Sequence, residues 1–279
     1  NISIKSNNFN GKKMINKILE DENKSIFENL NKNIKIDITK LFIDSNNYIE
    51  NVTGKIKYKN NKIIKLNLDG LFNNGEALSI KTFKRNEELI TNIFTNYPKP
   101  LIDRYKFIKG FEEGVLDFQS IKRNNKFNSL LIIDNFKVKE VPALAKILTL
   151  ASLQGIADLL TGEGIRFTDF EMKYTSQNNI IEIDELYAIG PAISILMSGY
   201  IEKNQLVSLR GTLVPATTIN RTISSIPLLG DILVGKKIGE GVFGVSFKIK
   251  GPPKNLKTTV NPIKTLTPRF ITRTLEKIK

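Results

Sequence analysis

The sequence contains neither cysteine nor histidine. Without histidine the chain lacks the side chain that most often acts as a general acid or base near neutral pH. Without cysteine it also has no thiol nucleophile, and zinc fingers and iron–sulfur clusters are excluded. These absences remove most enzyme classes, so we expect no catalytic residue, no metal site and no cofactor. They do not locate the protein, because disulfides are optional in an oxidising compartment.

The sequence also lacks a methionine at its start, since the first residue is Asn1. We therefore expect a piece of a longer chain, and we read nothing from the missing signal peptide. The longest apolar stretch, residues 141–164, contains Lys146, Gln154 and Asp158, each of which is costly near the centre of a bilayer. This stretch predicts a buried helix from Pro142 rather than a membrane span.

Length and charge set broad limits. The 279 residues are 41% hydrophobic, enough for the core of one large β domain or of two smaller ones. A net charge of +14 suggests an acidic partner such as nucleic acid or anionic lipid. However, the lysines are spread along the chain, and the basic runs lack interleaved aromatic residues. We therefore interpret the charge as solvated strand faces and expect no nucleic-acid partner.

Alternation of apolar and polar residues dominates the chain. In residues 33–38, Ile34, Ile36 and Ile38 fall on one face of an extended strand, and lysine and aspartate fall on the other. The same pattern recurs in residues 52–59, 63–70, 114–120, 129–138, 170–176, 180–186, 192–202, 206–213 and 244–251. We therefore predict a mainly β fold: a curved, elongated, antiparallel sheet that forms an open groove, with a few short helices.

Four stretches have helical spacing instead. They are residues 11–30, 98–110 and 141–164, and residues 215–235, which predict two short helices broken before Pro227. In the third stretch the predicted helix runs from Pro142 to Leu160, and we expect it to cover one end or side of the sheet.

The glycine motif G-x-G-x-x-G at Gly239, Gly241 and Gly244 is shared by nucleotide-binding loops. A kinase domain would have to follow it, but too few residues remain and the chain has no histidine for the catalytic loop. A Rossmann site needs a helix after the glycines, whereas Val245 and Phe247 alternate with polar residues as in a strand. The motif therefore predicts a turn or bulge rather than a nucleotide site.

Two groups of carboxylates could in principle serve a glycosidase that needs no histidine. The first is Glu112 with Glu113, and the second comprises Glu182, Asp184 and Glu185. Because Glu182 and Asp184 fall on the outward face of an alternating strand, we interpret them as solvated residues. No metal-binding pattern is evident. The apolar strand face keeps two interpretations, the core of a β-sandwich or an open track for acyl chains.

Five segments in the second half of the chain resemble the C-terminal region of the AsmA-like family, closest to its YhdP-like branch. The segments are residues 141–174, 187–202, 209–220, 226–252 and 260–270. The hairpins of residues 33–135 resemble the less distinctive β segments that precede this region. The resemblance implies that the glycine motif shapes the approach to a late strand, and it implies no catalytic residue.

The resemblance further implies a protein anchored in the inner membrane of a bacterium with two membranes. Its periplasmic part would be a β-groove that carries phospholipid toward the outer membrane and supports outer-membrane lipid homeostasis. The expected partners are phospholipid acyl chains, with the outer membrane or an envelope protein contacted through the C-terminal end. The expected division is a flanking segment at 1–32, β-groove hairpins at 33–140 and the family's C-terminal region at 141–279.

From the alternation and the resemblance we name two sets of candidate residues. The candidates for the lipid groove are Ile34, Ile36, Ile56, Tyr58, Ile64, Leu66, Leu68, Ile183, Ile195, Met197, Leu209, Val245 and Phe247. In a basic C-terminal helix, the candidates for a membrane surface are Phe270, Ile271, Arg273, Leu275, Lys277 and Ile278. A structural or scaffold β-domain and, less favoured, a polyanion-binding module remain alternative functions.

Overall fold

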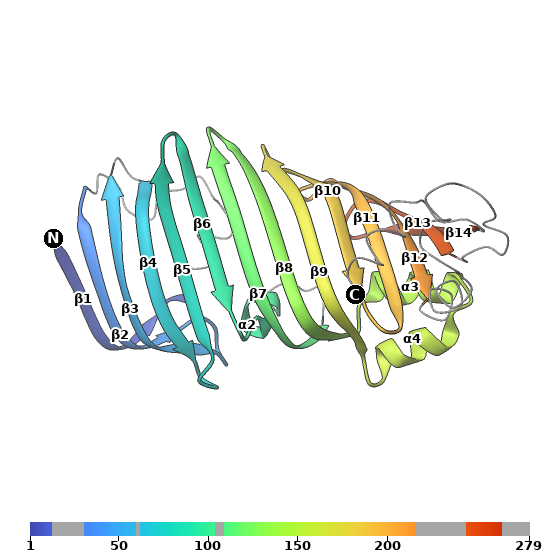
Figure 1. Cartoon of the computed structure of the whole chain (residues 1–279), viewed down its shortest axis with the longest axis horizontal. Coiled ribbons are helices and arrows are strands. Elements are labelled where there is room, and N and C mark those ends of the chain that lie inside the picture. Colours follow the sequence, from blue (N-terminus) through green and yellow to red (C-terminus); the bar gives the residue numbers. More distant parts are fainter. Residues whose placement is uncertain (13–30, 60–61, 104–108, 216–243, 264–279) are drawn as a thin grey trace, which may run out of the picture. The chain divides into compact units, whose positions relative to one another are not determined.

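The computed structural model describes residues 1–12, 31–59, 62–103, 109–215 and 244–263. In these ranges 14 strands form one open sheet, and each strand lies beside its neighbours in sequence (Figure 1). Three short helices accompany the sheet. The prediction of a mainly β fold with an open sheet and few helices is therefore confirmed.

The first eight strands are β1 (Ile2–Asn10), β2 (Asn33–Phe42), β3 (Tyr48–Lys59), β4 (Lys62–Phe72), β5 (Ala77–Arg85), β6 (Glu88–Thr95), β7 (Lys109–Arg123) and β8 (Lys126–Lys139). The other six are β9 (Ile165–Gln177), β10 (Ile180–Ile189), β11 (Ile193–Glu202), β12 (Leu206–Pro215), β13 (Gly244–Gly251) and β14 (Lys257–Ile263). The helices are α2 (Lys99–Ile102), α3 (Pro142–Leu150) and α4 (Gln154–Thr161).

Strand pairing is antiparallel from β2 to β7 and from β9 to β14, as the alternation predicts. The first pair differs, because β1 runs parallel to β2, with Ile2 opposite Ile34. Parallel neighbours need a crossover of roughly a dozen residues or more, and the sequence between Asn10 and Asn33 is long enough for one. Alternation within a strand does not specify the direction of its neighbour, so the sequence could not predict this pair.

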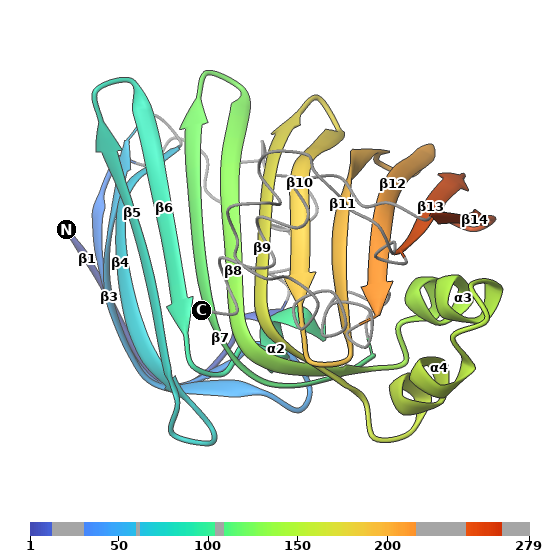
Figure 2. The same ribbon diagram turned by 45° about the vertical axis from the view of Figure 1, so that its right-hand side comes forward.

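The chain forms two compact units. The first unit contains residues 1–101 and 113–131, and the second contains residues 102–112 and 132–279. Figure 2 shows that strands of the first unit bend strongly along their length. The division into segments ending at residues 32 and 140 stays a prediction based on the resemblance.

The core of the first unit lies on one face of its strands. It comprises Ile38, Leu41, Ile43, Ile49, Val52, Phe72 and Leu78, all buried. Phe72 also contacts Tyr97 edge to face, with ring centroids 5.5 Å apart. This cluster collects the apolar side chains near one end of β2 to β5, and burial of such side chains is worth about 1.5–3 kcal/mol each.

The predicted helix from Pro142 to Leu160 forms two helices rather than one. The first, α3, ends at Leu150 with Ala151 as its C-cap, and Ser152 then adopts a left-handed backbone conformation with φ of +59°, which a continuing helix does not allow. α3 and α4 contact each other, α3 contacts β14, and α4 contacts β9. The expectation that this region covers part of the sheet is therefore met by a helical pair.

The helix predicted at residues 98–110 is found only in part among the described residues, which omit 104–108. Among the described residues only Lys99–Ile102 are helical, and Lys109 already begins β7. Gly110 has φ of +62°, a conformation that favours glycine and departs from a right-handed helix.

Several predicted features lie outside the described residues. These are almost all of the helix at 11–30, the helical pair at 215–235, Gly239 and Gly241 of the glycine motif, and the basic C-terminal segment. The third glycine of the motif, Gly244, opens β13, so the strand predicted after the glycines is present.

Candidate functional site

A row of half-buried apolar residues crosses the first unit from β2 to β7. The strand register places Ile36, Gly54, Leu68, Ile80, Ile93 and Phe118 side by side on one face, in that order. Each is half-buried, and the four aliphatic side chains pack against the core cluster. We call these six residues the apolar row. It presents five aliphatic and aromatic side chains in a line at right angles to the strands, with the side-chain-free Gly54 between Ile36 and Leu68.

The apolar row has different neighbours on its two sides. On one side lies the packed core around Val52 and Leu78. On the other side the adjacent row begins with Ile34, Ile56 and Leu66 and then becomes polar. There the Thr82 and Thr91 hydroxyls lie 3.0 Å apart, and those of Ser120 and Ser129 lie 2.9 Å apart. These hydroxyls satisfy one another, so the face is apolar at the row and polar beside it.

The structure brings most of the predicted groove residues of the first unit onto one face. Ile36 and Leu68 belong to the apolar row, and Ile34, Ile56 and Leu66 are directly opposite one another beside it. Two further candidates complete the set. Tyr58 on β3 is buried and lies opposite Ile63 on β4. The pairing of β3 with β4 shifts by one residue at this point, and Ile64 on β4 therefore has no register partner on β3.

The six candidates in the second unit also share one face. They fall in three rows: Ile183 with Leu209, Met197 with Phe247, and Ile195 with Val245. Ile183, Val245 and Phe247 are buried, whereas Ile195, Met197 and Leu209 are half-buried. The sequence therefore predicted the shared face, while the interpretation of these residues as a lipid groove stays a prediction.

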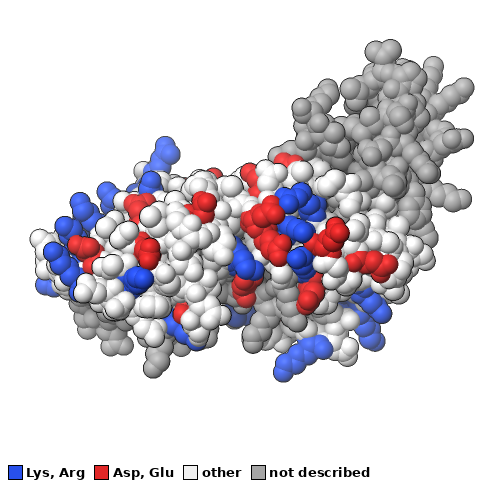
Figure 3. All heavy atoms as spheres, turned by 90° about the horizontal axis from the view of Figure 1, so that it is seen from below, with Lys and Arg blue, Asp and Glu red and all other residues white. Residues whose placement is uncertain are grey.

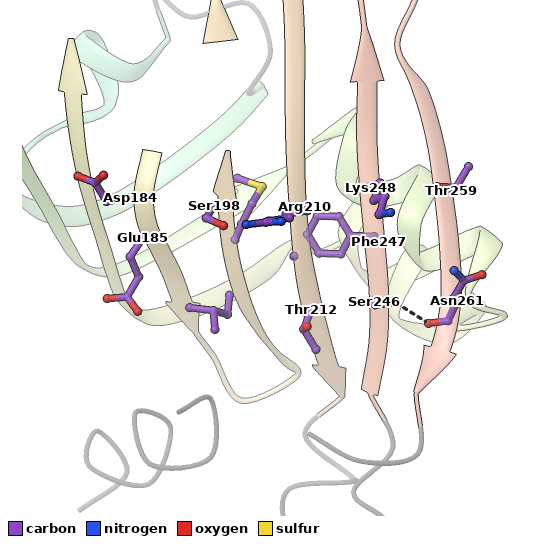
Figure 4. A pocket seen from close by; sticks show the side chains of 13 residues that line it. Asp184, Glu185, Ser198, Arg210, Thr212, Ser246, Phe247, Lys248, Thr259 and Asn261 are labelled. Atoms are coloured by element: carbon purple, nitrogen blue, oxygen red, sulfur yellow. Dashed lines mark hydrogen bonds between the residues drawn. The ribbon is translucent and has the colours of Figure 1, made fainter. Parts of the chain in front are cut away.

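The opposite, polar face of the second unit carries a hollow of about 350 Å³. Its lining comes chiefly from alternate positions of β10 to β14: Glu185, Leu196, Ser198, Arg210, Thr212, Ser246, Lys248, Thr259 and Asn261. Asp184, Gly211 and the two groove candidates Met197 and Phe247 complete the lining. Figure 4 shows Asp184 and Glu185 on one side, Lys248, Thr259 and Asn261 on the other, and Arg210 and Ser198 between them. We call this depression the polar hollow.

Sequence reasoning missed the polar hollow because a bulge in β10 changes which face Glu185 occupies. Strict alternation places Glu185 on the face of Ile183. The register of β10 shifts after Ile183 against both β9 and β11, and Leu186 then takes the apolar face opposite Met197. Both Asp184 and Glu185 consequently line the hollow. The signal in the sequence is a pair of consecutive acidic residues inside an alternating strand, which regular pleating cannot place on one face.

Two carboxylates outside the hollow form ion pairs. Glu112 forms an ion pair of 3.1 Å with Lys139, and Glu171 forms one of 2.9 Å with Lys173. Tyr187 also donates a hydrogen bond to Glu171. In the described ranges no group of three or more acidic residues could hold a metal ion.

The described ion pairs are mostly at the surface. Lys40 forms one of 3.4 Å with Glu50 and lies 4.7 Å from the centre of the Tyr48 ring. The hydrogen bond to Glu50, followed by the charge interaction with Tyr48, raises the pKa of Lys40 above its ordinary value. Figure 3 shows basic and acidic side chains interspersed on the face that it presents, rather than a single basic field.

The membrane-surface candidates Phe270, Ile271, Arg273, Leu275, Lys277 and Ile278 lie outside the described residues. Within the described ranges every helix falls short of the roughly 20 apolar residues that a bilayer span requires. Comparison of the chain with protein-family models, with curated proteins and with solved structures found no match.

Proposed function

We propose that this chain binds phospholipid acyl chains on the apolar face of its open sheet and passes them along it without catalysis. The observation that carries this proposal is the apolar row, which consists of five half-buried apolar side chains and Gly54 on six consecutive strands. A sheet that only needed a core would gain most by burying such residues fully. Their partial exposure leaves apolar surface free for a ligand.

The dimensions of the row suit an acyl chain. Five strand spacings of about 4.8 Å give a length of roughly 24 Å. One leaflet of a bilayer core is about 15 Å thick, so the row exceeds the length that one acyl chain spans there. Moving hydrocarbon through water costs about 0.8 kcal/mol per methylene, and a continuous apolar strip avoids that cost at each step. Aliphatic contacts have no preferred direction, which suits sliding.

In the cell we place this activity between two membranes. The chain is proposed as the periplasmic portion of a protein anchored in the inner membrane, and it contributes to lipid homeostasis of the outer membrane. Its C-terminal end would contact the outer membrane or an envelope protein. This part of the proposal rests on the resemblance of residues 141–270 to the AsmA-like family.

The first experiment asks whether the protein binds lipid. The purified chain is mixed with phospholipid in detergent, the detergent is removed, and bound lipid is counted by native mass spectrometry. We expect the wild-type chain to retain phospholipid. An Ile93→Asp variant should lose most of it, because a carboxylate in the middle of the row must be desolvated when a chain covers it.

A matched control separates binding from folding. Asn92→Asp adds the same charge one residue away, on the opposite face, and still offers an acceptor oxygen to the Gln119 amide 3.4 Å away. We expect Asn92→Asp to retain lipid and both variants to keep their far-UV circular dichroism. If Ile93→Asp loses lipid only in proportion to its loss of folded protein, Ile93 is ordinary core and the proposal fails.

A structural or scaffold domain is the second candidate function. It is favoured by the packed end of the same face, where Val52 and Phe72 are completely buried. A scaffold predicts that no phospholipid is retained by the wild-type chain and that lipid leaves its melting temperature unchanged, whereas a lipid-binding chain is stabilised by its ligand.

A further inference from the structure

The polar hollow divides its charged side chains by sign. Asp184 and Glu185 border it from β10, whereas Arg210 on β12 and Lys248 on β13 border it from the other side. The register places Arg210 opposite both Ser198 and Lys248, so the two cations are neighbours on adjacent strands. The hollow therefore has an acidic end and a basic end, with the hydroxyl of Ser198 between them (Figure 4).

The two ends form no ion pair with each other among the described residues. Glu185 and Arg210 lie on strands separated by β11, which puts their backbones roughly 10 Å apart. In the part of the chain that the structure describes, neither Arg210 nor Lys248 forms an ion pair. At the acidic end Glu185 is buried and Asp184 is exposed, and Lys173, which lies opposite Glu185, is paired with Glu171 at 2.9 Å. The two cations on the basic end thus remain available to a ligand.

Hydrogen-bond donors surround the basic end. Thr212, Ser246 and Thr259 border the hollow with hydroxyl groups, and Asn261 adds a side-chain amide. The Ser246 hydroxyl already donates its one proton to the Asn261 backbone carbonyl oxygen at 3.2 Å, so the hydroxyl donors left for a ligand at this end are those of Thr212 and Thr259. A guanidinium, an ammonium and several hydroxyls together suit a tetrahedral oxyanion, whose oxygens accept from several directions. The acidic end suits an ammonium group.

From this arrangement we infer that the polar hollow binds a phosphorylated amine, a small zwitterion in which a short linker joins a phosphate to an ammonium group. The phosphate lies against Arg210 and Lys248, and the ammonium lies toward Asp184 and Glu185. The bulge in β10 is what brings both carboxylates to this end. The inference is independent of lipid binding on the apolar row, because the apolar row belongs to the first unit and the residues of the hollow belong to the second.

The test is isothermal titration calorimetry with O-phosphoethanolamine, at low ionic strength and in a buffer without phosphate. Inorganic phosphate and ethanolamine are titrated separately. We expect O-phosphoethanolamine to bind at least about tenfold more tightly than either, because it engages both ends. Arg210→Ala and Lys248→Ala should each weaken binding about tenfold, in line with the loss of one hydrogen bond to a charged group.

Asp184→Asn is the variant that tests the acidic end. It should weaken binding of O-phosphoethanolamine and leave binding of inorganic phosphate unchanged. Arg123→Ala and Asp117→Asn make the same changes at exposed positions of the first unit and should alter neither affinity. The three hollow residues and the two controls are all exposed positions on strands, and circular dichroism verifies the fold of each variant.

A second arm distinguishes a free ligand from a lipid headgroup. Flotation with vesicles containing phosphatidylethanolamine presents the same phosphate and amine at a membrane surface. Binding of the free compound assigns the site to a free ligand, and binding only to these vesicles assigns it to a lipid headgroup. Either result supports the inference if Arg210→Ala reduces the binding. Absence of binding in both arms overturns it, as does equal affinity for phosphate and O-phosphoethanolamine. Neither of these negative results bears on Ile93, so the two proposals fail separately.

Discussion

Truncation of Leu148 to alanine tests whether the helical pair is part of the second unit's core. Leu148 is 0% exposed in α3, and this helix contacts α4 and β14. Alanine lacks three of the side-chain carbons of leucine, which at about 0.8 kcal/mol each removes roughly 2.4 kcal/mol of burial free energy. The cavity left behind adds to this loss, so we expect a decrease in unfolding free energy of about 3–4 kcal/mol, within the range for buried leucines.

The same helix provides the control. Leu150 is 42% exposed, and Leu150→Ala makes the same chemical change with the same effect on helix propensity. Because its side chain is already partly in water, we expect a loss of only about 1 kcal/mol. The difference between the two variants, about 2–3 kcal/mol, therefore measures burial of the α3 face rather than a property of leucine in helices.

Hydrogen exchange is the appropriate assay, because two compact units need not unfold in one step. Exchange of peptides from α3, α4 and β9 is followed by mass spectrometry at increasing urea concentrations, for the wild type and both variants. We expect Leu148→Ala to lower the protection of all three elements together. If it changes protection no more than Leu150→Ala does, α3 is a peripheral helix and the reasoning from burial is wrong.

Four further substitutions test single features of the strands and helices. Gly199→Ala should cost more than about 2 kcal/mol in a urea titration, because φ is +142° and an added Cβ would lie 2.2 Å from the Ser208 carbonyl oxygen. Gly155→Ala in α4 meets no atom and should instead stabilise by about 0.5–1 kcal/mol. Ser194→Ala should leave stability unchanged or raise it, since its hydroxyl, 1% exposed, has no hydrogen-bond partner among the described residues, and a loss above about 1 kcal/mol would reveal one. Because the pKa of Lys40 is raised in the folded state, its stabilising contribution is present at neutral pH and is lost as pH rises above 10.5, so the melting temperatures of wild type and Lys40→Gln should converge in alkali.

Alternation along each strand was enough to predict most of the sheet. Once Ile34, Ile36 and Ile38 are on one face, the same spacing in the neighbouring strands determines which side chains can share that face. The register then brings Ile34, Ile56 and Leu66 together as three direct neighbours. Groove candidates in the second unit, such as Met197 and Phe247, meet for the same reason. What the pattern could not supply is the degree of burial, since packed and open faces have the same alternation.

Features that depend on a partner strand or on one backbone angle were not predictable. The parallel pairing of β1 with β2 depends on the path of the chain between them rather than on either strand's own sequence. The break between α3 and α4 depends on the conformation of Ser152, a residue type that is common in helices, turns and loops alike. The apolar residues on both sides of it continue a helical pattern that local spacing alone predicts to be unbroken.

The polar hollow shows why the regular and irregular parts of this sheet suit different chemistry. Where pleating is regular, as along the apolar row, neighbouring positions repeat one kind of side chain, and the surface they form is extended and tolerant of many ligands. The bulge in β10 interrupts the alternation of side chains. It adds two acidic residues to the lining of a hollow whose other polar side chains are mainly hydroxyls and cations. Opposite charges held apart at fixed positions select a ligand by the spacing of its own charges. Selectivity in this chain is therefore to be sought at Asp184 and Arg210, and tolerance at Leu68 and Ile93.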